Sequence, residues 1–141
     1  MKNALRAFGL IALVAVIGFS MAACDSGGGG DSTSSALDGV WELSSNGYQI
    51  NIKGNTGYIK SFGNNTWALT AESKGNVRIG DPDTRNIKSA GNNTWTAETL
   101  LYYASGATQW TDCKLTLSAD GSSLTFYRPK ATSVYVTYTR R

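Results

Sequence analysis

Short stretches of alternating apolar and polar residues dominate the chain from Leu37 to Arg141, and Gly, Asn and Asp separate them. No apolar pattern with the 3.6-residue period of a helix runs through this part, whereas Thr, Tyr, Trp, Ile and Val are frequent, as strands prefer. This pattern predicts short antiparallel strands joined by tight turns. We therefore expect an all-β domain over 37–141, as a small up-and-down barrel or, alternatively, a β-sandwich.

The alternation predicts about ten strands, each with one face turned inward. It is clearest where Cys113, Leu115 and Leu117 share one face. Asp120-Gly121 follows this run, and Asp-Gly is a strong hairpin signal. The expected strands are 39–44, 48–53, 57–62, 66–71, 77–79, 85–89, 94–103, 111–118, 122–128 and 134–140.

One segment occurs twice: the sequence of residues 59–67 recurs at 87–95 with a single difference, and both copies contain Gly-Asn-Asn-Thr-Trp. Gly and Asn tolerate a positive φ, so Gly-Asn-Asn favours a tight turn between two strands. We predict two similar β-hairpins with Trp67 and Trp95 packed beside their turns. The alternative is a shared binding device in which the Asn pairs and both Trp side chains contact a sugar or a peptide.

The first 23 residues differ in composition from the rest. Lys2 and Arg6 are followed by an uncharged, mainly apolar stretch from Ala7 to Ala23. A positive start, a short apolar stretch and small residues before a cleavage site are typical of a secretory signal peptide. The stretch is near the lower edge of the roughly 20 residues that span a bilayer, so a retained membrane anchor is the alternative.

Met21-Ala22-Ala23-Cys24 resembles the lipobox of bacterial lipoproteins, although Leu, Val or Ile is more usual where Met21 stands. In that family the signal peptide is cut before the Cys, which receives a diacylglyceryl group and often a further acyl chain on its amino group. The resemblance implies that Cys24 is lipidated. Two or more acyl chains give stable anchoring, so we expect a membrane-anchored protein of the cell envelope, on the periplasmic or surface side.

Residues 25–36 are rich in Gly and Ser, which predicts a flexible tether that buries no core. We therefore divide the chain into a signal peptide (1–23), a lipidated Cys with its tether (24–36) and a barrel domain (37–141). Removing 1–23, with Lys2 and Arg6, lowers the formal charge from +3 to +1. That balance is not typical of a nucleic-acid-binding protein.

Gly39-Val40-Trp41 on the first expected strand resembles the Gly-x-Trp motif that opens the lipocalin and fatty-acid-binding (calycin) superfamily. There the Trp plugs the closed end of an up-and-down barrel, and an Arg from near the last strand packs over it. Arg140 shares its phase with Tyr138 and is therefore expected to face inward and to stack on Trp41. The whole layout is similar to that of small lipoproteins of spirochaetes and related bacteria.

The composition excludes several kinds of catalytic site. The chain has no His, so no Ser-His-Asp or Cys-His pair and no His metal ligand can form. Asp81 and Asp83 stand in an expected turn that lacks the further oxygen ligands of a Ca²⁺ loop. Cys113 is expected to be a buried, unpaired residue of the core. We expect no enzymatic activity, no metal and no cofactor.

The aromatic residues of the domain could line a ligand cavity or simply fill its core. We expect a non-enzymatic lipoprotein with a lipocalin-like barrel that holds a small hydrophobic ligand. The alternative is a protein- or glycan-interaction module that uses the paired Gly-Asn-Asn-Thr-Trp hairpins. The candidate contact residues are Trp67, Trp95, Tyr102 and Trp110.

Overall fold

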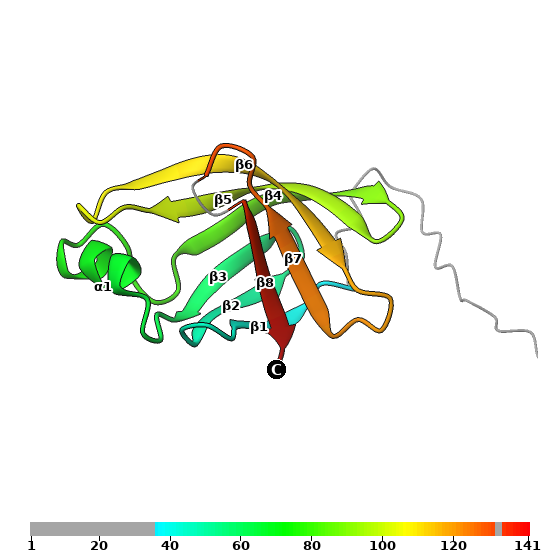
Figure 1. Ribbon diagram of the computed structural model, residues 1–141, viewed down its shortest axis with the longest axis horizontal. Coiled ribbons are helices and arrows are strands. Elements are labelled where there is room, and N and C mark those ends of the chain that lie inside the picture. Colours follow the sequence, from blue (N-terminus) through cyan, green and yellow to red (C-terminus); the bar gives the residue numbers. More distant parts are fainter. Residues whose placement is uncertain (1–35, 132–133) are drawn as a thin grey trace, which may run out of the picture.

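The computed structural model describes residues 36–131 and 134–141, so the expected signal peptide, Cys24 and all of the tether but Ala36 lie outside the described residues. Eight strands follow one another around a closed antiparallel barrel, and β1 pairs with β8 to complete it (Figure 1). The expected up-and-down barrel is thereby confirmed over the β-sandwich. The elements are β1 (Gly39–Leu43), β2 (Tyr48–Lys53), β3 (Thr56–Ser61), α1 (Thr66–Ser73), β4 (Pro82–Gly91), β5 (Thr94–Tyr102), β6 (Thr108–Leu117), β7 (Ser123–Tyr127) and β8 (Tyr135–Arg140).

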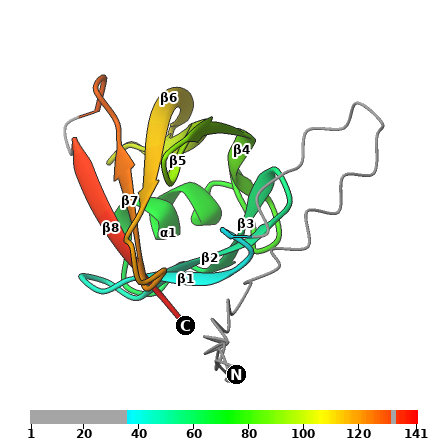
Figure 2. The same cartoon turned by 90° about the vertical axis from the view of Figure 1, so that its right-hand side faces the viewer.

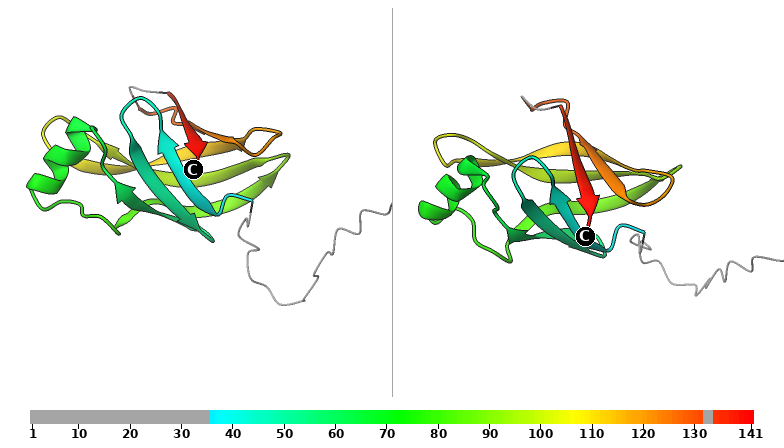
Figure 3. Two further views of the ribbon diagram at one scale, coloured as in Figure 1. Left: turned by 90° about the horizontal axis from the view of Figure 1, so that it is seen from below. Right: turned by 60° about the horizontal axis from the view of Figure 1, so that its bottom comes forward.

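The barrel has two different ends. At one, which we call the closed end, lie the start of β1, the end of β8 and the turns β2–β3, β4–β5 and β6–β7. At the other, the open end, lie the turns β1–β2, β5–β6 and β7–β8 and the longer connection that contains α1. Along the barrel axis, the strands form a ring with α1 behind it (Figure 2). Two further views show β1 beginning at the end remote from α1 (Figure 3).

Alternating side chains of the strands fill the barrel with a core. Ile50 and Ile52 of β2, Leu115 of β6 and Leu124 and Phe126 of β7 are almost completely buried. Cys113 belongs to the same core, as its alternation with Leu115 predicts, whereas Leu117 is only partly buried. The two-residue period therefore places most of the inward faces correctly.

One expected strand is a helix, and the boundaries of others differ. The prediction of a strand over 66–71 is wrong because α1 occupies this segment, and 77–79 does not form a strand. The Asn65 side chain caps α1 by accepting a hydrogen bond from the Ala68 amide at 3.1 Å. Ala68 and Ala71 are buried while Leu69 is exposed. The buried side of α1 is therefore formed by two residues at i and i+3, which is a helical spacing. In addition, β4 extends well beyond 85–89 and β6 begins before 111.

The two copies of Gly-Asn-Asn-Thr-Trp adopt different structures, so the prediction of two similar hairpins is wrong. In the second copy, Asn92 and Asn93 have φ values of 51° and 55° and form the β4–β5 turn. In the first copy, Gly63 packs against the β1–β2 turn, where a Cβ atom would lie 2.2 Å from the Asn46 carbonyl oxygen. The Asn64 amide also donates to this carbonyl at 2.6 Å. This long-range contact directs the chain into α1 instead of back into a strand.

Candidate functional site

The closed end is held by the predicted contact between Trp41 and Arg140. The guanidinium carbon of Arg140 lies 4.2 Å from the centroid of the Trp41 ring, so the predicted stack is confirmed. The same guanidinium donates to the carbonyls of Ala36, Asp38 and Gly121 at 2.6, 2.8 and 3.0 Å. The Arg140 side chain thus links the segment that precedes β1, the β6–β7 turn and β8.

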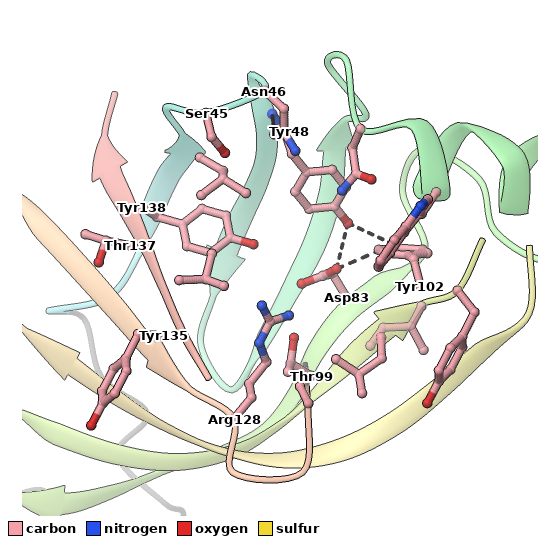
Figure 4. Close-up of a pocket in the computed structure, with 18 of the residues that line it drawn as sticks. Ser45, Asn46, Tyr48, Asp83, Thr99, Tyr102, Arg128, Tyr135, Thr137 and Tyr138 are labelled. Carbon is pink, nitrogen blue, oxygen red and sulfur yellow. Dashed lines mark hydrogen bonds between the residues drawn. The ribbon is translucent and has the colours of Figure 1, made fainter. Parts of the chain in front are cut away.

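A cavity of about 710 Å³ occupies the open end of the barrel (Figure 4). Its wall is contributed by the β1–β2 turn, the segment that begins α1, the last residues of β5 and the β7–β8 connection. Trp67, Tyr103 and Tyr135 lie at its mouth and are substantially exposed. Cavities of this size, with mixed apolar walls and a few convergent polar groups, are typical of small-molecule sites.

Asp83 is the buried acidic group of this cavity. It is 2% exposed, and its Oδ1 accepts hydrogen bonds from the hydroxyls of Tyr48 at 2.6 Å and Tyr102 at 3.5 Å. Its Oδ2 accepts from the Thr84 hydroxyl at 3.0 Å. The two tyrosine hydroxyls also lie 2.8 Å apart. Asp83 is therefore a hydrogen-bonded carboxyl at the inner end of the cavity.

A β-bulge explains why Asp83 points inward. Thr84 pairs with Gly57 of β3, but Pro82 pairs with the next residue, Tyr58, so that Asp83 is the extra residue between them. Asp83 and Thr84 are consequently both buried, although they are consecutive. The sequence predicted a plain turn at 80–85; this is wrong for Asp83, which belongs to β4.

Burial governs the titration of this cluster. It raises the pKa of Asp83, although the hydroxyl hydrogen bonds from Tyr48 and Thr84 and the positive charge of Arg128 act in the opposite direction. Burial, and next the negative charge of Asp83, raises the pKa values of Tyr48, Tyr102 and Tyr138. The phenols therefore remain protonated near neutral pH and serve as hydrogen-bond donors.

Arg128 follows β7 and sends its guanidinium toward the same inner end of the cavity (Figure 4). Within 36–131 and 134–141, no hydrogen bond or ion pair engages this guanidinium, and its Nε is buried without a partner. Tyr138 points its hydroxyl into the same space. Sequence reasoning missed both Asp83 and Arg128, although Arg128 continues the inward phase of Leu124 and Phe126.

The four aromatic candidates from the sequence do not form one site. Tyr102 lines the cavity, and Trp67 lies at its mouth with 48% of its surface exposed. Trp95 is 6% exposed and belongs to the core. Trp110 is partly buried against the core but does not line the cavity, and the guanidinium of Arg85 stacks on it at 4.0 Å. The structure therefore brings together only Trp67 and Tyr102.

Other reactive groups are few. Burial raises the pKa of the Cys113 thiol to about 12, and this cysteine forms no disulfide within the part of the chain that the structure describes. No group of three or more Cys, Asp or Glu side chains suited to a metal ion occurs among the described residues. Nor does any helix in 36–131 or 134–141 have the length and apolarity needed to cross a membrane.

Comparisons with protein-family models, with curated proteins and with solved structures gave no match for this chain. Function therefore has to be argued from the cavity itself. Its polar groups include the buried carboxyl of Asp83 and the hydroxyls that donate to it, and its mouth is aromatic. Such an arrangement can bind and orient a small molecule with an apolar body and a polar end.

Proposed function

We propose that this protein is a non-enzymatic, lipid-anchored lipoprotein of the cell envelope whose barrel binds a small hydrophobic ligand. The cavity at the open end is the observation that carries the ligand-binding part of the proposal. Leu43, Leu100 and Val136 contribute apolar wall, and the aromatic rings of Trp67 and Tyr102 add to it. The proposed anchor at Cys24 is supported by the sequence resemblance to a lipobox.

The two parts of the proposal are geometrically compatible. The described chain enters the barrel at Ala36, where its carbonyl accepts from Arg140, and this is the closed end. The cavity lies at the opposite end. A barrel tethered through Cys24 would therefore carry its closed end nearer the membrane attachment point. The residues between Cys24 and Ala36 could extend over about 40 Å at most, which leaves the cavity mouth free to meet a ligand.

The anchor is tested by labelling the protein in a bacterial host with a clickable palmitate analogue. We expect incorporation into the unaltered chain and into the Cys113→Ser variant, but not into Cys24→Ser. Cys113→Ser is the matched control because it removes the only other cysteine of the chain. Equal incorporation in the absence of Cys24, or none in the unaltered chain, would contradict lipidation at this residue.

The ligand part is tested with N-phenyl-1-naphthylamine, an uncharged dye that fluoresces in apolar cavities. We expect saturable binding, with one dye per barrel. Leu100→Trp should weaken it by filling cavity volume, because Leu100 is a buried residue of the wall. Leu117→Trp, at the far end of β6, is the control. The absence of saturable dye binding, with no ligand found by native mass spectrometry, would contradict the proposal.

The alternative that uses paired hairpins as an interaction device is not proposed further. Trp67 and Trp95 differ in structure as well as in exposure, since one belongs to α1 and the other to β5. The β4–β5 turn and α1 also lie at opposite ends of the barrel (Figure 1). The two copies therefore present no common surface.

A further inference from the structure

The inner end of the cavity contains a guanidinium that the described residues leave without a partner. The Arg128 amide donates to the Val134 carbonyl at 2.7 Å, which fixes the backbone where β7 ends. The side chain continues the inward face of Phe126 and lines the cavity. Its Nε is buried and unpartnered, and no ion pair within 4.0 Å joins the guanidinium to Asp83 in the described part of the chain. A guanidinium in this state offers donors suited to a planar or tetrahedral anion.

Tyr138 of β8 supplies a second donor beside Arg128. Its ring packs against Phe126 with the ring centroids 4.9 Å apart, so its position is set by the core. Its hydroxyl is directed into the cavity, toward the space that the Arg128 guanidinium enters from below in this view (Figure 4). None of the hydrogen bonds among the described side chains uses this hydroxyl, in contrast to Tyr48 and Tyr102, which are committed to Asp83.

Asp83 differs from Arg128 because its oxygens already have partners. Tyr48 and Tyr102 donate to one oxygen and Thr84 to the other. Its carboxylate nevertheless places a negative charge in a buried site next to the free donors. A ligand anion bound by Arg128 would therefore meet a like charge, and such a neighbour favours the protonated form of a buried carboxyl.

We propose that Arg128 and Tyr138 bind an acidic oxygen group of an amphipathic ligand, such as a carboxylate, sulfonate or phosphate, and that Asp83 takes up one proton from solvent when this group binds. The inference rests on the ligand-binding function proposed above and specifies the chemical class of the ligand. The apolar walls hold the body of the ligand, and the donors at the inner end hold its charged group. Protonation of Asp83 removes the repulsion between the two negative charges.

Asp83 is the group of this cluster that changes charge in the accessible pH range. The groups that face it are Tyr48 of β2, Tyr102 of β5, Cys113 of β6, Arg128 after β7, and Tyr138 of β8. Burial raises the pKa of every phenol and of the thiol, so these groups stay neutral between about pH 4 and 8. Arginine as a residue type carries its charge throughout this range. Lys130, the remaining charged residue that lines the cavity, is exposed at the mouth.

The test uses two dyes that share one aromatic body. 1-Anilinonaphthalene-8-sulfonate carries a sulfonate, and N-phenyl-1-naphthylamine does not. We expect Arg128→Gln to weaken binding of the sulfonate dye by about tenfold and to leave binding of the uncharged dye within about twofold. Tyr138→Phe should weaken binding of the sulfonate dye a few-fold. The matched control, Tyr58→Phe, alters a tyrosine of β3 that is exposed and does not line the cavity, so it should change neither affinity.

Proton uptake is measured by isothermal titration calorimetry in two buffers of different ionisation enthalpy, at steps from pH 4 to 8. The sulfonate remains ionised throughout, so any dependence on pH belongs to the protein. We expect uptake that approaches one proton at its maximum and tighter binding as the pH falls. Both effects should disappear in Asp83→Asn, whose fold is checked by circular dichroism and thermal melting.

The outcomes separate this inference from the function on which it rests. If the uncharged dye binds but Arg128→Gln affects both dyes equally, the anion site is wrong and the ligand-binding barrel stands. If the sulfonate dye depends on Arg128 but binds without proton uptake at every pH, or with the same uptake in Asp83→Asn, the linkage to Asp83 is wrong. If neither dye binds, the proposed function and the inference both fail.

Discussion

Two arginine residues of this barrel differ in whether other groups of the protein bind their guanidinium groups. Arg140 and Arg128 lie near opposite ends of the barrel interior, yet only Arg140 has its donors engaged within the described residues. A guanidinium that stacks on Trp41 and binds three carbonyls is a structural group. A guanidinium that enters a cavity without such partners is available to a ligand. Arginine therefore stabilises the closed end through Arg140 and provides hydrogen-bond donors in the cavity at the open end through Arg128.

The buried carboxyl of Asp83 predicts a specific dependence of stability on pH. Its pKa in the folded protein lies above the unfolded value of 3.8, so protonation of Asp83 stabilises the folded state relative to the unfolded state. This contribution is complete below the unfolded pKa and is lost as the pH rises through the folded pKa. Each unit of elevation corresponds to about 1.4 kcal/mol. Asp83→Asn does not titrate, so its stability relative to the unaltered protein should improve as the pH rises from 3 to 7.

The measurement is urea unfolding of both proteins at each pH, with Asp120→Asn as a control of opposite sign. Hydrogen bonds from Ser118 and Ser122 lower the pKa of Asp120 to about 2. The stabilisation that Asp120 provides is present above its unfolded pKa and is lost as the pH falls through the folded value. The loss of unfolding free energy caused by Asp120→Asn should therefore become smaller at acidic pH. A constant difference between Asp83→Asn and the unaltered protein across this range would rule out the assigned shift.

At the scale of elements, one short sequence forms two structures because its surroundings differ. Asn65 has an extended backbone, with φ −74° and ψ 96°, and caps α1. Its counterpart Asn93 is left-handed, with φ 55°, in the β4–β5 turn. The first copy is held by the β1–β2 turn through Asn64, and the second by pairing between β4 and β5. Local propensity permits both conformations, and long-range contacts select one.

Substitution by Thr at the two equivalent positions should reveal this difference. A Thr hydroxyl can cap a helix, so Asn65→Thr should change stability by only a few tenths of a kcal/mol. A β-branched residue is disfavoured at positive φ, so Asn93→Thr should lose about 1–2 kcal/mol. Chemical denaturation of the two variants, with Asn65→Ala as a cap-deficient reference expected to lose about 1 kcal/mol, measures this. Equal losses for the two Thr variants would show that the backbone assignments are wrong.

At the scale of the whole molecule, a continuous ring of hydrogen-bonded strands surrounds the core. Cys113 lies in β6, between β5 and β7, and is 5% exposed. Because every strand has two neighbours, no sheet edge is left from which the barrel could open strand by strand. Access to this thiol is therefore expected to require unfolding of much of the barrel.

Thiol labelling tests this expectation in a chain that carries Cys24→Ser, so that Cys113 is the only thiol. Its reaction with a disulfide reagent at pH 8 should be at least about a thousandfold slower than in urea-unfolded protein. Two causes contribute, since the thiol is buried and its pKa is raised to about 12. Rapid labelling of the folded protein would mean that the strands around Cys113 separate locally.

The amino-acid sequence determines those features that follow from an uninterrupted two-residue alternation. This pattern identifies an all-β barrel, the inward faces of β6 and β7, and the common inward phase that brings Arg140 onto Trp41. The same alternation also predicts that Arg128, two residues after the buried Phe126, faces inward. These are properties of regular strands, in which the position along the chain fixes the side of the sheet.

The tertiary structure alone decides the remaining features. The bulge in β4 moves Asp83 out of phase and buries it beside Tyr48 and Tyr102, which are distant in the chain. The contact between Gly63 and the β1–β2 turn converts an expected strand into α1. Neither outcome follows from local propensity, because an inserted residue reverses the alternation and a long-range contact selects among conformations that are locally similar in energy.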